Sequence, residues 1–224
     1  LALFASTIDV TNGYGNITYE YVHELRKHKD ISLTLFLPKN EAELGHQLIA
    51  DVNARYCLPP YIFRARPWNI VPYFCPPDVR EFDLVHSLFD FPYCFSAAVS
   101  ARRARKPFIM GVQGTYGVLP LTWPIERMML MYAYRHAKEI IVPSRFTEEK
   151  TKQYAREILP IRIIHNGVDY LRFQKQVDSA AIREKYSGKK IILTVGGLRN
   201  RKGHELVIMA LARVRAQVPT IAYV

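Results

Sequence analysis

The sequence predicts an α/β protein built on a doubly wound, mainly parallel sheet, and three observations support this fold class. Short apolar runs alternate with amphipathic stretches along most of the chain, which is the pattern of parallel strands joined by right-handed helical crossovers. Glycine-bearing loops follow two of these runs, at 12–16 and 196–197. A polar connection at 170–190 separates the two loops. We therefore expect a first domain at residues 1–175 and the first strand-helix-strand unit of a second domain at 176–224.

The first apolar runs flank a helix and give way to an irregular segment. Residues 1–5 and 31–37 have the composition of buried strands. The stretch between them carries apolar residues four positions apart, which predicts a helix: Ile17, Tyr21 and Leu25. Residues 56–77 are rich in proline and aromatic side chains, and we expect a long loop with a short helix there.

The middle of the chain repeats the alternation of strand and helix. Strands are expected at 84–87 and 108–112, with a helix of small residues around 97–104 between them. That helix ends in a run of cations, which is typical of a solvated helix end, with a lipid-binding site as the alternative: Arg102, Arg103, Arg105 and Lys106. A turn at 113–117 precedes a helix whose apolar stripe we expect to pack in the core: Ile125, Met128, Met129 and Tyr132.

A third strand-helix-strand unit closes the first domain. Residues 139–142 and 161–164 are short β-branched runs. Ser144 follows the first of them and is a suitable N-cap for a helix that extends through Tyr154. The second run ends in the turn His165-Asn-Gly-Val168. In such a sheet, ligands bind at the carboxyl ends of the strands.

Composition and charge restrict the class of protein. Of the 224 residues, 49% are hydrophobic and 12% aromatic, enough for a sizeable core. The formal net charge is +11, which attracts phosphates, anionic lipid or nucleic acid. Nine cations and two acids lie between residues 183 and 215, but Tyr186 is the one aromatic side chain among them. Because nucleic-acid binding surfaces interleave aromatic and basic residues, we expect no nucleic-acid partner.

The cysteines and the apolar runs indicate a cytoplasmic protein. The three cysteines, Cys57, Cys75 and Cys94, have neither the even number of a disulfide framework nor the spacing of a zinc site. Neither a membrane-spanning run nor a secretory signal is visible. Strand-like runs stand at both ends, so we expect this chain to be a piece of a longer polypeptide.

The carboxyl-terminal glycine loop has the features of a phosphate-binding turn. The apolar strand from Ile191 leads into Gly196-Gly197, where the absence of a Cβ lets the backbone approach a ligand. A helix that begins after Gly203 would point its free N–H groups at the same place. Fixed positive charges stand between the turn and the helix: Arg199, Arg201 and Lys202.

Three segments in order resemble a known enzyme family, the retaining glycosyltransferases of the GT-B fold, family 4 type. They are the loop 12–16 with its helix, the pair of segments 140–147 and 164–173, and the turn 195–203. In the second pair, Val142-Pro-Ser144 and Asn166-Gly-Val-Asp169 resemble the family's signatures before its interdomain linker. The resemblance implies two Rossmann-like domains facing each other across a cleft. It also implies a hexosyltransferase that uses a nucleotide-activated sugar, with no cofactor and no metal.

The resemblance also implies site residues. Donor phosphate would be held by Arg199, Lys202 and Gly15. The substrate cleft would contain Gly13, His86, Gln113, Gly114 and Asn166. Two of these have an equally plain structural interpretation, because His86 fits a satisfied core histidine and Asn166 fits a turn.

This sequence departs from the family pattern at two places. Gly197 stands where the family has a phosphate-binding arginine, and Arg199 is our candidate to replace that charge. Gln113 stands at the family's cleft histidine; an amide can bond a sugar hydroxyl but cannot serve as an acid or base. The catalytic residue is therefore left unassigned, and the reaction would use the donor's own phosphate as base.

Several functions remain open from the sequence. The leading one is a retaining sugar transferase acting on a glycan, a lipid-linked or a small acceptor. A nucleotide-sugar epimerase or binding module of the same fold is the second, and a basic membrane-surface binding protein is the third. Peripheral contact with the inner face of the membrane is compatible with transfer to a lipid-linked acceptor. We expect this 224-residue chain to be inactive by itself, since the family's donor carboxylates would lie beyond Val224.

Overall fold

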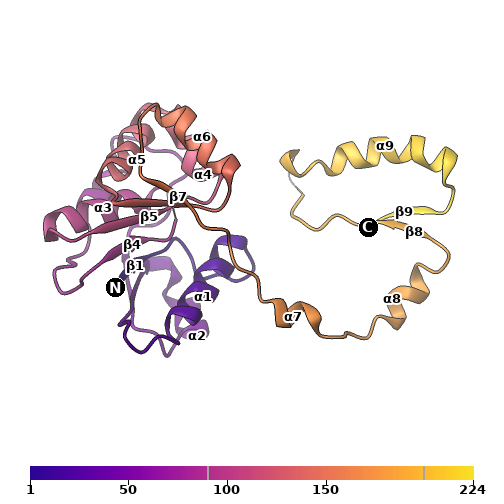
Figure 1. Cartoon of the computed structure of the whole chain (residues 1–224), viewed down its shortest axis with the longest axis horizontal. Coiled ribbons are helices and arrows are strands. Elements are labelled where there is room, and N and C mark those ends of the chain that lie inside the picture. The colour runs from indigo at the N-terminus through magenta and orange to yellow at the C-terminus, as the bar shows by residue number, and fades with distance from the viewer. Residues whose placement is uncertain (90, 199) are drawn as a thin grey trace. The chain divides into compact units, whose positions relative to one another are not determined.

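The chain folds as two units that follow each other in sequence. The computed structural model describes residues 1–89, 91–198 and 200–224, and its contacts separate Leu1–Gly167 from Val168–Val224 (Figure 1). The boundary expected near residue 175 falls at the end of the first helix of the second unit, α7 (Tyr170–Gln174).

A seven-stranded sheet forms the centre of the first unit. Its strands pair in parallel in the order β3-β2-β1-β4-β5-β6-β7, which confirms the α/β, doubly wound class. The strands are β1 (Ala2–Phe4), β2 (Thr34–Pro38), β3 (Ala54–Leu58), β4 (Val85–Ser87), β5 (Phe108–Gly111), β6 (Glu139–Val142) and β7 (Ile161–Ile163).

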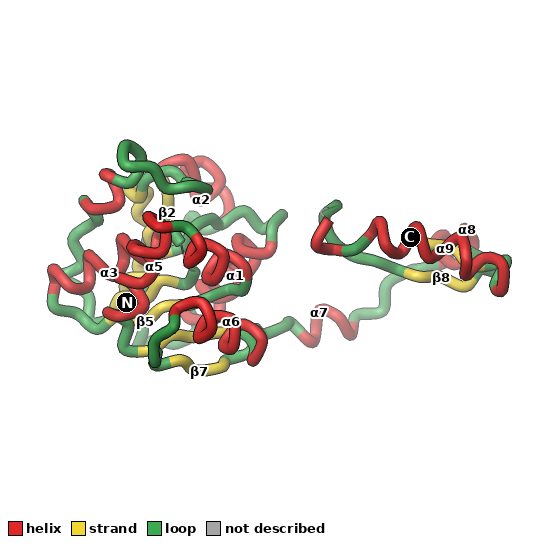
Figure 2. Tube along the Cα trace, turned by 90° about the horizontal axis from the view of Figure 1, so that it is seen from above, coloured by secondary structure: helices red, strands yellow, loops and turns green. Residues whose placement is uncertain are grey.

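Helices connect the strands, and their alternation along the trace can be followed in Figure 2. They are α1 (Gly13–Leu25), α2 (Ala42–Leu48), α3 (Tyr93–Ala104), α4 (Thr115–Val118), α5 (Pro124–His136) and α6 (Arg145–Ala155), with short 3₁₀ turns η1 (Lys39–Glu41), η2 (Val71–Phe74) and η3 (Leu119–Thr122). The Ser144 side chain caps α6 as expected, accepting a bond from the amide of Thr147 at 3.2 Å. Within the described residues, no helix has the length and apolar character needed to cross a membrane.

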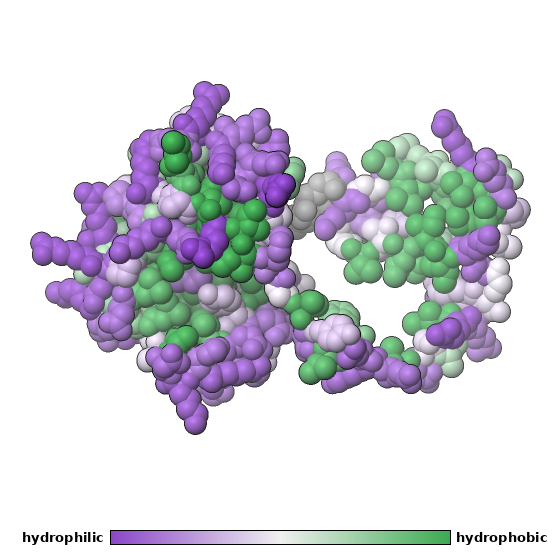
Figure 3. All heavy atoms as spheres, viewed as in Figure 1, coloured by the Kyte–Doolittle hydropathy of each residue, from purple (hydrophilic) through white to green (hydrophobic). Residues whose placement is uncertain are grey.

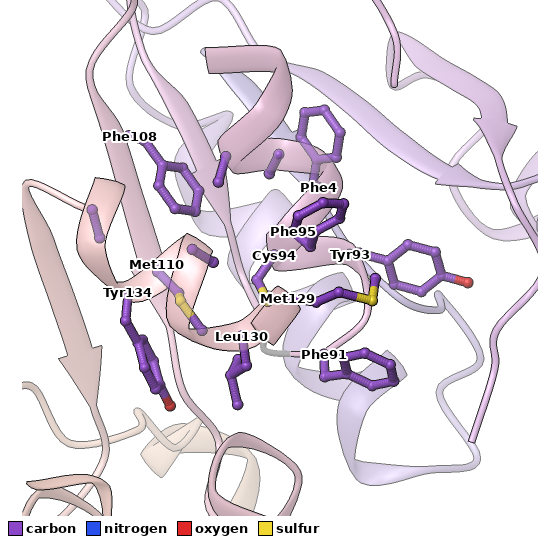
Figure 4. Packing of buried hydrophobic residues seen from close by; sticks show 14 of the residues in the cluster. Phe4, Phe91, Tyr93, Cys94, Phe95, Phe108, Met110, Met129, Leu130 and Tyr134 are labelled. Atoms are coloured by element: carbon purple, nitrogen blue, oxygen red, sulfur yellow. The ribbon is translucent and has the colours of Figure 1, made fainter. Parts of the chain in front are cut away.

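The core of the first unit has two layers, one on each face of the sheet. Neighbouring residues of β1 point to opposite faces, so Leu3 joins the layer under α1 and α2 while Phe4 joins the layer under α3 and α5. Phe4 stacks on Phe36 of β2 with ring centroids 4.9 Å apart. Figure 4 shows the second layer, where Phe95 and Met129 extend from the helices toward the sheet. Because both faces are covered, the inner strands β1, β2 and β5 are almost entirely apolar.

Two features of the first unit differ from the sequence expectation. The segment 56–77 is not irregular from its start, since Tyr56 lies in the edge strand β3, where exposed and partly buried residues alternate. An edge strand with one solvent-exposed face lacks the continuous apolar run that is typical of inner strands. Met128 is also not in the core: its side chain is 54% exposed, while Met129 is fully buried, because one residue along a helix turns the side chain by about 100°.

The second unit has a small parallel sheet and one long helix. Its elements after α7 are α8 (Ala180–Lys185), β8 (Lys190–Ile192), η4 (Asn200–Lys202), α9 (His204–Gln217) and β9 (Ile221–Tyr223). Strands β8 and β9 pair in parallel, as a strand-helix-strand unit requires. No described residue of this unit is buried. Apolar side chains remain exposed on it (Figure 3). Leu198 and Leu206 are two of them.

Candidate functional site

The candidate site follows from the order of the strands. The chain leaves β1 toward β2 and β3 on one side and then continues with β4 on the other side. The loops after β1 and β4 therefore diverge, which is where open parallel sheets bind ligands. The loops after β1, β5 and β7 carry four of the predicted cleft residues: Gly13, Gln113, Gly114 and Asn166.

The loop between β1 and α1 is held in shape by its own carboxylate. Asp9 accepts bonds from the amide and hydroxyl of Thr11 at 2.9 and 2.7 Å and from the side-chain amide of Asn12 at 3.2 Å. These bonds, first those from Thr11, lower the pKa of Asp9 below its usual value. Asn12 then caps α1 by accepting a bond from the amide of Gly15 at 2.9 Å. The loop is therefore ordered before any ligand binds.

Gly15 is required by the path of this loop. A Cβ placed on Gly15 would lie 2.0 Å from the carbonyl oxygen of Asp9, whereas one on Gly13 would meet nothing within 4 Å. The loop thus folds back against the first turn of α1. Because the amide of Gly15 is already bonded to Asn12, a contact between that amide and a phosphate remains a prediction.

Glu41 anchors the same loop from outside and was not found from the sequence. Its carboxylate accepts bonds from the Thr7 hydroxyl at 2.9 Å and from the Ile8 amide at 3.0 Å. Glu41 belongs to η1, which follows β2. The strand order brings it beside the first loop, and no local sequence pattern connects residues more than thirty positions apart.

Gln113 and Asn166 form a reciprocal amide pair on the side of the sheet where the strands have their carboxyl ends, which we call the carboxyl edge. Nε2 of Gln113 donates to Oδ1 of Asn166 at 3.3 Å, and Nδ2 of Asn166 donates to Oε1 of Gln113 at 3.0 Å. The Tyr14 hydroxyl donates to the carbonyl of Gln113 at 3.3 Å. This chain of bonds links the loops after β1, β5 and β7, so the structure brings together residues that the sequence singled out separately.

His86 lies apart from this edge. It is 5% exposed, in β4 beneath α1, with its Nδ1 3.3 Å from the hydroxyl of Tyr21. Burial lowers the pKa of His86 to about 4 and raises that of Tyr21. The sequence allowed two interpretations of His86, a residue of the substrate cleft or a core histidine. The geometry fits the neutral core histidine.

A small hollow adjoins Gly114 at the same edge of the sheet. It measures about 200 Å³ and lies between η3 and α6. Apolar surface from Leu119, Phe146 and Tyr154 lines it together with the hydroxyl-bearing Thr122. Phe146 is 68% exposed.

The predicted phosphate-binding turn is organised within the second unit. The stem of Lys202 lies beside Gly196, where a Cβ would be 3.6 Å from its Cδ and Cε. His204, the first residue of α9, lies with Nε2 3.3 Å from the carbonyl of Gly197 and Nδ1 3.0 Å from the Tyr223 hydroxyl. His204 was not singled out from the sequence. Arg199 lies outside the described residues.

The described residues contain no cluster of histidine, cysteine or carboxylate side chains that could hold a metal ion. The polar groups described at this end of the first unit are amides, hydroxyls and backbone groups, together with the carboxylates of Asp9 and Glu41. Amides and hydroxyls can donate and accept hydrogen bonds with sugar hydroxyls.

Comparison with protein families gives a match to the model described as Glycosyltransferase Family 4, over residues 11–172. That span runs from the first glycine loop through the Asn166 turn. No curated protein matches the chain in sequence.

Solved structures share the fold at low sequence identity. The chain is similar to Anabaena HepE in complex with UDP-glucose (TM-score 0.67, 17% identity) and in complex with UDP and glucose (TM-score 0.68, 18% identity). In both cases 99% of this chain and 59% of the HepE chain are covered. A structure of S. aureus MnaA with UDP matches with a TM-score of 0.58 and 15% identity, covering 99% of this chain and 61% of that one. This chain therefore spans about three fifths of the length of these proteins.

Replacing Gly15 tests the shape of the first loop. We expect Gly15→Ala to lower the free energy of unfolding by about 2 kcal/mol or more, since its methyl group has no space against the Asp9 backbone. Gly13→Ala is the matched control, and we expect a change within about 1 kcal/mol because its Cβ position is open. Urea denaturation of both variants measures the difference. Equal stability of the two would contradict the close approach.

Burial of His86 predicts a pH dependence of stability. The unfolded chain takes up a proton near pH 6.5, whereas the folded chain does so only near pH 4. Stability is therefore fully present above pH 6.5 and falls as the pH is lowered, by about 2 kcal/mol between pH 7 and pH 5. Urea denaturation at both values should show this loss in the native chain and in His23→Gln, but not in His86→Gln. A loss that persists in His86→Gln would refute the assignment.

Proposed function

The chain belongs to glycosyltransferase family 4, and from that premise we propose that it takes part in transferring a sugar from a nucleotide-activated donor to an acceptor, with retention of anomeric configuration. The first unit would form the acceptor side of the cleft, and the second unit would supply the opening of the donor-binding domain. The observation that carries the proposal is the chain of hydrogen bonds that connects Tyr14, Gln113 and Asn166 at the carboxyl edge. The family match covers all three residues.

For the donor we propose a uridine diphosphate sugar, with UDP-glucose as the first candidate. The support comes from HepE, whose structure was solved in complex with UDP-glucose and shares this fold. Departure of the diphosphate leaves negative charge on its oxygens, which a nearby cation and free amide groups stabilise. Lys202 and the first turn of α9 are the groups of the described chain that would do so.

Gln113 would position the sugar rather than transfer a proton. Its amide is held by Asn166, and a sugar hydroxyl could replace one of those two bonds without leaving either amide unpaired. A primary amide does not titrate near neutral pH. A proton acceptor must then come from another group, and we propose the leaving phosphate of the donor.

For the acceptor we propose the hollow beside Gly114. Its size, about 200 Å³, suits one sugar ring, and the exposed faces of Phe146 and Tyr154 suit the apolar C–H face of such a ring. Thr122 offers a hydroxyl to the polar edge of the ring. A glycan or a glycosylated lipid headgroup fits this chemistry.

A nucleotide-sugar epimerase or binding module is the second candidate function. Gln113 and Gly197 favour it because they replace the family's histidine and arginine. Structural similarity extends to such proteins, including UDP-GlcNAc 2-epimerase from Neisseria meningitidis (TM-score 0.51, 15% identity, 100% of this chain and 65% of that chain). Either function would place the protein in the reducing cytoplasm, which Cys57, Cys75 and Cys94 fit because none of these three forms a disulfide.

Calorimetric titration with UDP-glucose tests the donor proposal. We expect weak, measurable binding that Lys202→Ala reduces about tenfold or more, because a charge-assisted contact to the diphosphate is lost. Lys189→Ala removes an exposed cation of the same unit, outside the turn, and should bind as the native chain does. Equal weakening by both variants would show attraction by overall charge alone and would contradict the proposed clamp.

Product analysis in the whole protein separates the two candidate functions. Transfer predicts release of UDP that depends on an added acceptor, while epimerisation predicts an isomeric sugar without one. We expect the 224-residue chain alone to bind without turnover, since its second unit buries none of its described residues. Turnover by this chain alone would overturn that expectation.

A further inference from the structure

An open groove of about 650 Å³ lies on the first unit, away from the candidate site. Residues of α3 and α5, two helices that pack against each other, line it together with Phe74 of η2. It is larger than the hollow beside Gly114. None of the residues assigned to the transferase site lines it.

The floor of the groove is apolar and largely aromatic. Phe95 packs edge-on against Phe74 and Tyr132, with ring centroids 4.8 and 5.4 Å away. Phe74 is 39% exposed and Met128 is 54% exposed, and both border the groove. Leaving such side chains in water is unfavourable, by an amount that grows with the exposed apolar area.

The rim of the groove is cationic. Arg102 and Arg103 stand in the last turn of α3, and Arg135 and His136 stand in the last turn of α5. Nη1 of Arg102 donates to Nε2 of His136 at 2.8 Å, and Nδ1 of His136 lies 2.7 Å from the Tyr132 carbonyl. Arg102 of α3 is therefore bonded to the last turn of α5.

Carboxylates are scarce around this rim. No acidic side chain lines the groove among the described residues. Glu157 pairs with Arg135 from outside, and Asp78 lies in an adjoining hollow, where it pairs with Arg80. Cations in a last helical turn also stabilise the helix. That effect explains the charges but leaves the exposed aromatic floor unexplained.

The cationic rim of the groove lies at the opposite ends of the strands from the candidate site. Crossover helices run antiparallel to the strands they connect, so their last turns lie near the amino ends of the strands. The candidate site lies at the carboxyl ends. A large partner at the groove would therefore leave the carboxyl edge of the first unit open.

We propose that this groove is a docking surface for a membrane that contains anionic phospholipid. Such a lipid combines the two chemistries that the groove presents, an apolar chain for the aromatic floor and a phosphate for Arg102 and Arg103. A bilayer surface also attracts the net charge of +11 as a whole. A peptide bound as an added β-strand is not favoured, because both walls are helices whose backbone groups are already bonded. The proposal does not depend on the transferase function.

Co-sedimentation of the 224-residue chain with vesicles tests the docking surface. We expect binding to vesicles of equal parts phosphatidylcholine and phosphatidylglycerol and little binding to phosphatidylcholine alone. The double variant R102Q/R103Q should bind roughly 20-fold more weakly, at about fivefold per cation near the surface. The control K27Q/K29Q removes two exposed cations beyond α1 and should change binding by less than about threefold.

Met128→Gln separates insertion into the groove from attraction by charge. Met128 is exposed, so the variant should fold normally while binding about threefold more weakly, because its apolar side chain no longer enters the lipid. Unchanged binding by Met128→Gln would overturn the proposal, as would equal losses in R102Q/R103Q and K27Q/K29Q. Binding of dodecyl phosphate or an acidic peptide at the groove without binding of vesicles would also overturn it.

Discussion

Parallel pairing of the seven strands is the constraint on which the rest of the first unit depends. Every strand enters the sheet from the same side, so every crossover helix must pack on a face and every loop after a strand must emerge at one edge. Both faces are then buried, which explains the apolar strands and the neutral, buried His86. The same constraint brings Tyr14, Gln113 and Asn166 within hydrogen-bond distance although they are far apart in sequence.

The sequence predicted those parts of the fold that a periodic apolar pattern marks. The inner strands, the helix α1 and the Ser144 cap of α6 are of this kind. The edge strand β3 was missed because one of its faces is wet, and Met128 was misplaced because a helical stripe shows only which face is apolar. In the candidate site, the sequence indicated Gln113 and Asn166 separately, but it did not predict the hydrogen bonds between their side chains. The roles of Glu41 and His204 could not be predicted from the sequence. The partner of Glu41 lies far along the chain, and His204 contacts a backbone carbonyl.

The two edges of the sheet have different chemistry. At the carboxyl edge, amides and hydroxyls are already bonded to one another and can exchange those bonds for sugar hydroxyls. At the amino edge, arginines surround exposed aromatic rings, a combination suited to an anionic amphiphile. If both proposals hold, one unit would bind a membrane and a polar substrate at the same time, which suits an acceptor carried on a lipid.

We propose, as the central claim, that the carboxyl edge of the first unit binds the sugar of a nucleotide-activated donor and that the glycine turn of the second unit binds the diphosphate. Hydrogen exchange of the chain, with and without saturating UDP-glucose, tests it most directly because it reports protection at each loop. We expect the backbone amides of residues 9–15, 112–114, 165–167, 195–198 and 200–203 to exchange more slowly when UDP-glucose is bound. Protection at the turn alone, or no protection at any of these segments, would contradict it.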